Sequence, residues 1–258
     1  MTPDDVIAGR AQWCVVNGER DEFLASHGDS AFDVTLTDPP YNERTHRGAK
    51  VRGGKLEAGT TVRFAALDGF AWWRDTLRIT RRWCLAFCAA EHLGEYENAA
   101  GDAWIRAGVW VRVGAAPQFT GDRPATGADA VAIAHLEGRK RWNGGGSAAL
   151  WSHGFAADEK GAARLHETQK PLALMREMVR LFSDPGEVIL DCHAGSGTTG
   201  VAALLEGRRV VLVERDPVHA ETCRRRLAET IPGEGSRRAK QLALFGGVIA
   251  HRRSRASG

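Results

Sequence analysis

The tetrapeptide Asp38-Pro39-Pro40-Tyr41 has the side chains and the backbone needed to hold an amino group. Proline has a fixed φ and no N–H donor, so the carbonyls beside the two prolines have few local partners and can face a ligand. The Asp38 carboxylate and the Pro39 carbonyl then offer two acceptors for the two hydrogens of an amino group. Taken alone, the tetrapeptide is equally compatible with a proline turn that only ends a strand.

The chemistry that suits this segment is substitution at a nucleobase amino group. The exocyclic amino group of adenine or cytosine is a weak nucleophile, because its lone pair is delocalised into the ring. Two acceptors that hold both hydrogens favour a pyramidal nitrogen and aim its lone pair at a sulfonium methyl group. Tyr41 would stack on a base taken out of the helix. The tetrapeptide therefore predicts direct methyl transfer without a covalent enzyme intermediate.

A second segment, residues 188–200, runs from an apolar stretch through a glycine-rich turn into a helical pattern. Gly195, Gly197 and Gly200 match G-x-G-x-x-G, and glycines at such a turn let the backbone approach a ligand closely. The helix that follows would present unpaired N–H groups to a carboxylate or phosphate. We therefore predict a cofactor site at this turn.

Two carboxylates beside the turn bear on which cofactor it would take. The next apolar stretch, residues 209–213, ends in Glu214, which can accept hydrogen bonds from both hydroxyls of a ribose. This suits an adenosine cofactor of either kind, a nicotinamide dinucleotide or S-adenosylmethionine. Asp191 favours S-adenosylmethionine, because a carboxylate at the strand end can meet an ammonium group but would repel a pyrophosphate.

The elements that must position these motifs alternate between strand-like and helix-like stretches. Such alternation indicates an α/β fold with a mainly parallel sheet and helices on both faces. Residues 42–66 read as a long mobile loop, and residues 138–165 are rich in glycine and tryptophan without a clear period. The predicted strands cover residues 12–17, 32–37, 84–87, 109–113, 129–135, 187–190 and 209–213, and the predicted helices begin at Arg20 and Glu91 or cover 69–81, 171–182, 198–206 and 217–231.

Composition is that of a soluble globular protein: 43% of the 258 residues are hydrophobic and 26% are charged. The sequence contains no apolar run of bilayer length and its first ten residues contain no apolar stretch, so we expect a cytoplasmic protein without a membrane segment. The five cysteines are scattered without a zinc pattern, and we expect buried free thiols and no metal site. Residues 1–231 read as one domain and residues 232–258 as a basic, flexible tail.

Together these segments resemble the amino-methyltransferase family of DNA methyltransferases, from about Gln12 to Leu227. The tetrapeptide precedes the glycine turn, which is the circularly permuted order of the beta class. The segment His166-Glu167-Thr168-Gln169-Lys170-Pro171 is similar to the His-x-Thr-Gln-Lys-Pro segment of that class. The resemblance implies a Rossmann-like S-adenosylmethionine-dependent methyltransferase fold. It implies transfer to N6 of adenine in DNA, with N4 of cytosine as the alternative; aspartate as the first residue of the tetrapeptide favours adenine.

The resemblance also implies roles for individual residues. Asp38, Pro39, Pro40 and Tyr41 would be the catalytic segment. The family usually has Asp-Pro-Phe where this chain has Asp191-Cys192-His193, so a histidine replaces an aromatic that lines the cofactor. We expect His193 to pack there rather than act as a general base, with a lower cofactor affinity. The implied cofactor residues are Asn17, Gly18, Thr168, Lys170, Asp191, His193, Ala194, Gly195, Gly197, Thr198, Thr199 and Glu214.

Residues 118–165 correspond to the interval that holds the target-recognition region in the family. Arginine and lysine can read guanine or clamp phosphates of double-stranded DNA, although any one of them could equally be a solvated surface residue. The interval is short, so the 42–66 loop is expected to help. The candidate DNA contacts are Arg44, Arg47, Arg123, Arg139, Lys140 and Arg141.

Other function classes fit less well. RNA and protein-glutamine methyltransferases usually place the glycine turn before an Asn-Pro-Pro-Tyr, so both order and first residue differ. A nicotinamide oxidoreductase leaves the tetrapeptide unexplained, and a catalytically inactive DNA-binding module does not require Asp38 and Tyr41. Methylation at carbon 5 of cytosine uses a cysteine nucleophile, usually after a proline, and the sequence contains no Pro-Cys pair.

One apolar stretch interrupts the basic tail. Residues Gln241-Leu242-Ala243-Leu244-Phe245 resemble the Gln-Leu-x-Leu-Phe pentapeptide that docks on the bacterial DNA sliding clamp. Closely spaced apolar anchors in a flexible peptide can fill a preformed pocket on a partner. The alternative is that the stretch folds back onto its own domain. The sequence leaves open whether the chain forms a homodimer.

Overall fold

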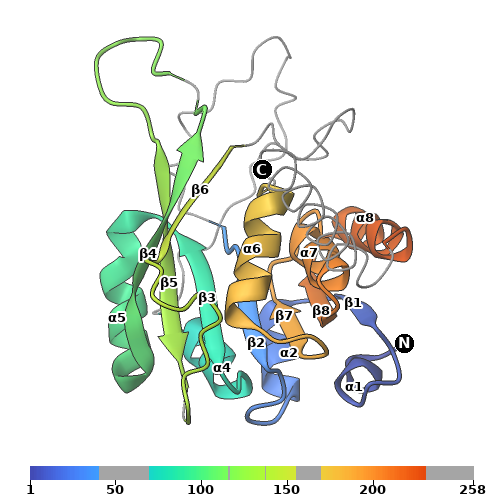
Figure 1. Ribbon diagram of the computed structural model, residues 1–258. Helices are drawn as coiled ribbons and strands as arrows, with labels where there is room; N and C mark the ends of the chain where they lie inside the picture. Colours follow the sequence, from blue (N-terminus) through green and yellow to red (C-terminus); the bar gives the residue numbers. More distant parts are fainter. Residues whose placement is uncertain (41–69, 116, 137, 155–169, 231–258) are drawn as a thin grey trace, which may run out of the picture.

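The computed structural model describes residues 1–40, 70–115, 117–136, 138–154 and 170–230. Within these ranges one sheet has the strand order β1-β8-β7-β2-β3-β5-β4-β6 (Figure 1). Its strands are β1 (Trp13–Asn17), β2 (Val34–Thr37), β3 (Trp83–Cys88), β4 (Trp104–Val113), β5 (Ala128–His135), β6 (Leu150–Gly154), β7 (Val188–Asp191) and β8 (Arg209–Glu214). The helices are α1 (Pro3–Ile7), α2 (Arg20–Ser26), α4 (Ala71–Ile79), α5 (Leu93–Ala100), α6 (Leu172–Phe182), α7 (Thr198–Leu205) and α8 (Pro217–Ala228), with short 3-10 turns η1 (Ala90–His92) and η2 (Gly101–Ala103).

The sheet is mainly parallel, as predicted. Strands β1, β8, β7, β2 and β3 pair in parallel, whereas β5 runs antiparallel to both of its neighbours, β3 and β4. Every residue of β2, β3 and β7 is buried. Burial on both faces explains why these strands appear in the sequence as continuous apolar runs rather than as alternating patterns.

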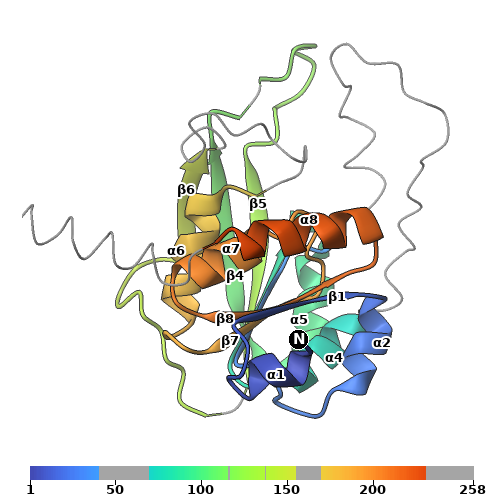
Figure 2. The same ribbon diagram turned by 90° about the vertical axis from the view of Figure 1, so that its right-hand side faces the viewer.

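Helices cover both faces of the sheet, which confirms the expected layers. Helices α6, α7 and α8 pack on one face, around side chains such as Leu85, Ile189 and Leu212. Helices α1, α2, α4 and α5 pack on the other face, where Trp73 and Tyr96 are among the largest buried side chains. Figure 2 shows α7 and α8 on one side of β8 and β1, with α1, α2 and α4 on the opposite side.

The centre of the sheet contains a topological switch point. Strands β2 and β7 are neighbours, and the chain leaves β7 through α7 toward β8 on one side, whereas β3 lies on the other side of β2. In open α/β sheets the crevice outside the carboxyl ends of the strands at such a point is the usual ligand site. We call the edge where β1, β8, β7, β2 and β3 end the carboxyl edge, and the edge where they begin the amino edge.

Helix α1 and strand β6 were not predicted, and strand β4 is longer than predicted. Strand β6 lies within residues 138–165, which were expected to lack regular structure, and pairs in parallel with β4. Strand β4 begins at Trp104, five residues earlier than expected. Trp151 of β6 is buried against Gly108 of β4, where a Cβ would come within 2.6 Å of the indole. Strand β6 therefore depends on a tertiary contact, and its own residues carry no strand periodicity.

The five cysteines are buried and unpaired, as expected. Burial raises the pKa of the Cys88 and Cys192 thiols to about 12, so both are inert neutral groups at ordinary pH. No helix within the described ranges is long and apolar enough to cross a membrane.

Candidate functional site

The structure brings the end of the tetrapeptide strand and the start of the glycine turn together. Thr37, the last residue of β2, donates a hydrogen bond from its hydroxyl to Asp191 Oδ1 over 2.8 Å. These two residues are 154 positions apart in the chain, and both are at most 2% exposed. Asp38 follows Thr37 directly, so the predicted catalytic and cofactor segments meet at the switch point of the carboxyl edge.

Asp38 lies beside Lys170, which is one of the cofactor residues that the resemblance implies. Lys170 Nζ is 2.6 Å from Asp38 Oδ2, and the lysine side chain is 10% exposed whereas that of Asp38 is 26% exposed. The ammonium also lies 4.8 Å from the ring centre of Phe87 and 5.7 Å from that of Trp110. Aromatic faces attract such a cation, so they help to hold Lys170 against one oxygen of Asp38.

Asp191 is the most deeply buried carboxylate of the site. Burial raises its pKa to about 6, and the negative charge of Asp38 adds to the rise. Hydrogen bonds from Thr199, from the backbone N–H of His193 and from Thr37 oppose it. A buried carboxylate in this state favours a cationic ligand, which would replace the water that the carboxylate lost on burial.

His193 lies in the turn after β7, beside Thr37 and Arg20. Its Nδ1 is 3.0 Å from Thr37 Oγ1, and its Nε2 is 3.1 Å from Arg20 Nη1. The ring packs edge-on against Trp72, with 5.1 Å between ring centres. Burial, with the charges of Arg20 and Arg215, lowers the pKa of His193 to about 3. The imidazole is therefore neutral at ordinary pH, as a packing residue would be.

The glycine turn has the backbone that its sequence predicts. Gly195 has φ +52° and Gly197 has φ +78°, a region that side-chain-bearing residues rarely adopt. A Cβ on Gly197 would lie 3.0 Å from the Cys223 sulfur. Ala194 N–H is bonded to the Val213 carbonyl over 3.1 Å, which ties the turn to β8.

The threonines after the turn begin α7. Thr198 and Thr199 are both buried. Thr198 Oγ1 lies 3.3 Å from Arg226 Nη1 of α8, and Thr199 donates toward Asp191. The first turn of α7 is therefore fixed on one side by α8 and on the other by the buried carboxylate.

Glu214 ends β8 next to the turn. One carboxylate oxygen accepts the Gly195 N–H at 2.7 Å, and the other accepts the Asp216 N–H at 2.9 Å. Each oxygen has a second lone pair for a hydroxyl donor. Asn17 and Gly18 both contact the backbone carbonyl of Glu214. The side-chain amide of Asn17 and the backbone N–H of Gly18 each donate a hydrogen bond to it.

Some predicted site residues lie outside the described residues, namely Tyr41, Arg44, Arg47 and Thr168. Pro39 and Pro40 follow β2 as expected, with Pro39 buried. Arg20 was not predicted as a site residue. Its only signal in the sequence is its position shortly after the first predicted strand, residues 12–17, and its contact with His193 spans 173 positions.

The predicted DNA contacts are not all at the same edge. Arg123 is exposed in the connection between β4 and β5 and pairs with Asp122 at 2.9 Å. Arg139, Lys140 and Arg141 are exposed too, but Arg141 lies at the amino edge, where its carbonyl accepts the Trp83 indole N–H at 2.7 Å. The structure thus separates this cluster from Asp38 by the length of β3, and a DNA-binding role for it stays a prediction.

Other residues of the 118–165 interval support the fold. Trp151 is 2% exposed within the core. Asn143 donates from its amide to the carbonyls of Arg180 and Ser183, at the end of α6. The Asn143 amide therefore ties this interval to the end of α6.

Comparison with known proteins places these observations in a family. A family model described as DNA methylase, for N6- and N4-methyltransferases, matches residues 97–225, half of the 258-residue chain. The chain belongs to this family of DNA amino-methyltransferases. It is similar to the type II methyltransferase M.HinfI of Haemophilus influenzae, with 24% identity over 247 residues that cover 84% of this chain and 69% of that protein.

Solved structures share the fold. The crystal structure of an M1.HpyAVI–SAM complex has a TM-score of 0.63 and 17% identity, covering 83% of this chain and 98% of that one. The PvuII DNA methyltransferase, described as cytosine-N4-specific, has a TM-score of 0.62 and 13% identity, covering 87% and 89%. At these identities the likeness establishes the α/β methyltransferase fold of this family member.

Proposed function

We propose that this DNA amino-methyltransferase transfers a methyl group from S-adenosylmethionine to the exocyclic N6 of adenine. The observation that carries the proposal is the hydrogen bond between Thr37 and Asp191, because it joins the tetrapeptide strand to the glycine turn. A methyl donor at the turn would then lie next to a base amino group at Asp38. The methyl donor and the target base would then bind at the same edge of the sheet.

The residues of the carboxyl edge fit this cofactor. Asp191 is a buried carboxylate that would gain from an ammonium partner, and Glu214 keeps lone pairs for ribose hydroxyls. The turn itself, Ala194 to Gly197, contains no side chain larger than that of serine. S-adenosylmethionine, when bound, supplies a sulfonium methyl group. The SAM complex of M1.HpyAVI, which shares the fold, supports the same assignment.

Asp38 would hold the target amino group. Lys170 occupies Oδ2, so the oxygen that points to the amino group is Oδ1, and the Pro39 carbonyl provides the second acceptor. The Lys170 contact also fixes the orientation of the carboxylate, because one of its oxygens is held by the ammonium. Tyr41 would stack on the extruded base. These residues would orient the target amino group and stabilise the charge that develops on its nitrogen, as direct methyl transfer requires.

Adenine is favoured over cytosine by the first residue of the tetrapeptide. Aspartate at this position is the form that resembles adenine-directed members, and serine the form that resembles cytosine-N4 members. The fold is compatible with both, since the PvuII enzyme, described as cytosine-N4-specific, shares it. Transfer to N4 of cytosine is therefore the second candidate.

The remaining parts of the chain are assigned on the sequence. We propose a single domain over residues 1–231, with double-stranded DNA meeting the carboxyl edge through Arg123 and the 42–66 segment. The likeness to a type II methyltransferase favours a role beside a restriction nuclease. Residues 241–245, outside the described residues, are proposed to dock on a sliding clamp. A pull-down of purified clamp should succeed with the wild-type chain and fail when Leu244 and Phe245 are both alanine; equal capture of both would refute the docking.

The function is tested by expressing the chain in methylation-free bacteria and sequencing the DNA with modification-sensitive reads. We expect N6-methyladenine at one short recurring sequence. A strain that expresses Asp38→Ala is the matched control and should show none. Methylated N4 of cytosine would select the second candidate, and unmodified DNA from a strain with soluble wild-type protein would refute both.

A further inference from the structure

A continuous chain of hydrogen bonds connects the start of α2 to the buried carboxylate of the cofactor turn. Arg20 Nη1 is 3.1 Å from His193 Nε2, His193 Nδ1 is 3.0 Å from Thr37 Oγ1, and Thr37 Oγ1 is 2.8 Å from Asp191 Oδ1. Three separate parts of the chain contribute to it, namely α2, β2 and the end of β7. Its members are far apart in sequence, so only the fold brings them into line.

The chemistry of the donors fixes the direction of every bond in this chain. A guanidinium can only donate, so His193 Nε2 must be the acceptor and the ring proton must be on Nδ1. Nδ1–H then donates to the Thr37 oxygen, which leaves the hydroxyl hydrogen for Asp191. The lowered pKa of His193, about 3, agrees with a neutral ring. Hydrogen bonds that follow one another in this way strengthen each other.

We propose that Arg20 and His193 are positioning residues that act through Thr37 to orient the Asp191 carboxylate for the cationic group of the cofactor. This inference rests on the proposed function, because it takes Asp191 as the partner of that group. It gives a role to His193, the position at which the chain departs from the aromatic residue of its family.

Packing holds the two positioning side chains in place. The Arg20 guanidinium lies 5.0 Å from the ring centre of Trp72, and the edge-on contact of His193 is with the same indole. Trp72 belongs to α4 and is 3% exposed. A buried tryptophan that contacts both side chains restricts their rotation, so the imidazole is presented to Thr37 in one orientation.

The Thr37 bond matters because burial disfavours the charge of Asp191. Its hydrogen bonds with Thr199, His193 N–H and Thr37 lower a pKa that burial raises. The titratable groups around it are Asp38 just after β2, Cys192 and His193 from its own turn and Cys223 from α8, with Arg20 beyond the imidazole. Loss of the Thr37 bond should therefore raise the pKa of Asp191 further, so that the carboxylate is protonated at a higher pH.

The test measures the Kd for S-adenosylmethionine by calorimetry between about pH 5 and pH 8.5. His193→Gln keeps an acceptor for Arg20 but loses the donor to Thr37, whereas the shorter His193→Asn places an amide N–H near the position of Nδ1. Thr37→Val and Thr37→Ser form the second matched pair. We expect His193→Gln and Thr37→Val to weaken binding roughly tenfold near pH 7. In both variants the pH below which binding is lost should be higher than in the wild-type chain. His193→Asn and Thr37→Ser should recover most of the affinity.

A double variant separates positioning from packing. If His193 acts through Thr37, His193→Gln should weaken binding little further in the Thr37→Val background. Equal losses for His193→Gln and His193→Asn, or an unchanged pH profile in Thr37→Val, would overturn the inference. If the wild-type chain itself fails to bind S-adenosylmethionine, the proposed function fails, and this inference with it. Thermal unfolding of each variant verifies that the protein measured is folded.

Discussion

The two edges of the sheet hold their carboxylates in different ways. At the carboxyl edge, Asp191 and Glu214 are held by hydroxyl and backbone N–H donors. No ion pair among the described residues includes either of them. Of the three carboxylates of the candidate site, only Asp38 has a cationic partner among the described residues, Lys170, and that contact uses a single carboxylate oxygen.

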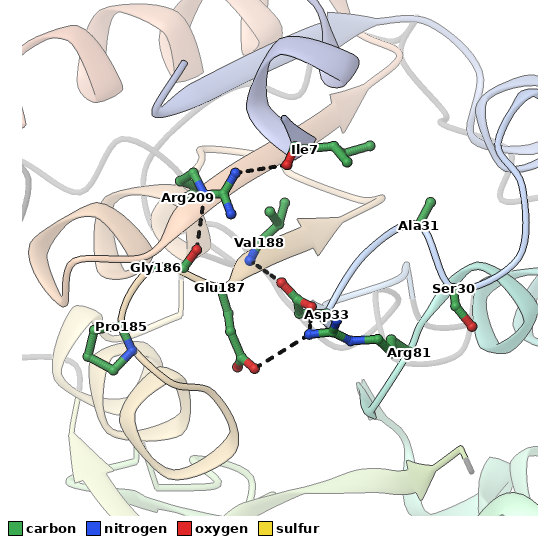
Figure 3. Close-up of a pocket in the computed structure, with 10 residues that line it drawn as sticks. All are labelled: Ile7, Ser30, Ala31, Asp33, Arg81, Pro185, Gly186, Glu187, Val188 and Arg209. Carbon is green, nitrogen blue, oxygen red and sulfur yellow. Dashed lines mark hydrogen bonds and ion pairs between the residues drawn. The ribbon is translucent and has the colours of Figure 1, made fainter. Parts of the chain in front are cut away.

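At the amino edge the carboxylates are paired with arginine. Asp33 pairs with Arg81, and Glu187 pairs with Arg82 and lies 3.9 Å from Arg81. Figure 3 shows Arg81 between the two carboxylates, at a surface depression of about 610 Å³. Arg209, which also lines the depression, donates to the carbonyls of Ile7 and Gly186. The charges that line this depression already have partners within the protein.

The difference favours the carboxyl edge as the edge that binds a ligand. Carboxylates paired with arginine have already exchanged water for a partner and contribute to the fold. Carboxylates held only by neutral donors keep their charge uncompensated and can still gain from a cation or a hydroxyl group. Substitutions at the carboxyl edge should therefore affect function, and substitutions at the amino edge should affect stability.

The largest expected effect is that of Asp38→Ala on methyl transfer. Loss of the acceptor that holds the reacting nitrogen should lower turnover by about 1000-fold, the upper end of the range for one preorganised transition-state contact. Binding of S-adenosylmethionine should survive. Transfer of labelled methyl groups to DNA measures the first quantity and calorimetry the second. If the variant kept the wild-type turnover, the carboxyl edge would not be the site of methyl transfer.

Glu214→Ala should produce the next largest effect. Loss of charge-assisted hydrogen bonds to the ribose should weaken cofactor binding by about 1–3 kcal/mol. Glu214→Gln keeps an acceptor of similar shape and is the matched control, with a smaller loss. Calorimetry on the three proteins measures both. A dissociation constant unchanged in Glu214→Ala would place the ribose elsewhere.

The amino edge should respond in the opposite way. Glu187→Ala removes the nearer of the two carboxylates paired with Arg82, the other being Asp184 at 3.6 Å, and the side chains of Glu187 and Arg82 are about 15% exposed or less. Leaving Arg82 without this carboxylate should lower the free energy of unfolding by about 2 kcal/mol. Methyl transfer per folded molecule should not change. Denaturant unfolding and turnover, measured on the same preparation, test the comparison, and a turnover loss without a stability loss would break it.

The smallest expected effect is that of Asp191→Asn on the free energy of unfolding, because the buried charge of Asp191 opposes folding. A folded pKa of about 6, against an ordinary 3.8, means that this group favours folding most below about pH 4 and loses that contribution as the pH rises through 6. Asp191→Asn should therefore stabilise the cofactor-free protein near pH 7 by on the order of 1 kcal/mol. It should also weaken cofactor binding. The stabilisation should disappear below about pH 4, and melting curves across this range would show whether it does.

Much of the fold could be predicted because the central strands are buried on both faces. Strands β2, β3, β7 and β8 follow from their apolar runs, and the glycine turn follows from the positive φ that Gly195 and Gly197 adopt. Strand β6 could not be predicted from its own residues, since Leu150–Gly154 includes serine, histidine and glycine. It exists because Trp151 packs on Gly108.

The site was predicted at the level of motifs but not of contacts. The motifs identify Asp38, Asp191 and Glu214, because each lies at the carboxyl end of a strand. The Lys170 contact with Asp38 and the Arg20 contact with His193 join residues 132 and 173 positions apart. No local pattern encodes such pairs, since they depend on the order of strands in the sheet. The 139–141 cluster was placed by charge alone, and charge does not show which edge a loop follows.

The most direct measurement is the identity of the methylated nucleoside. Purified protein would be incubated with DNA and isotopically labelled S-adenosylmethionine, and the DNA then digested to nucleosides for mass spectrometry. We predict label in N6-methyldeoxyadenosine with the wild-type chain and none with Asp38→Ala protein that still binds the cofactor. Label in N4-methyldeoxycytidine would contradict the adenine assignment alone. Equal label from both proteins, or none from wild-type protein that binds the cofactor, would contradict the assignment of Asp38 and the carboxyl edge to methyl transfer.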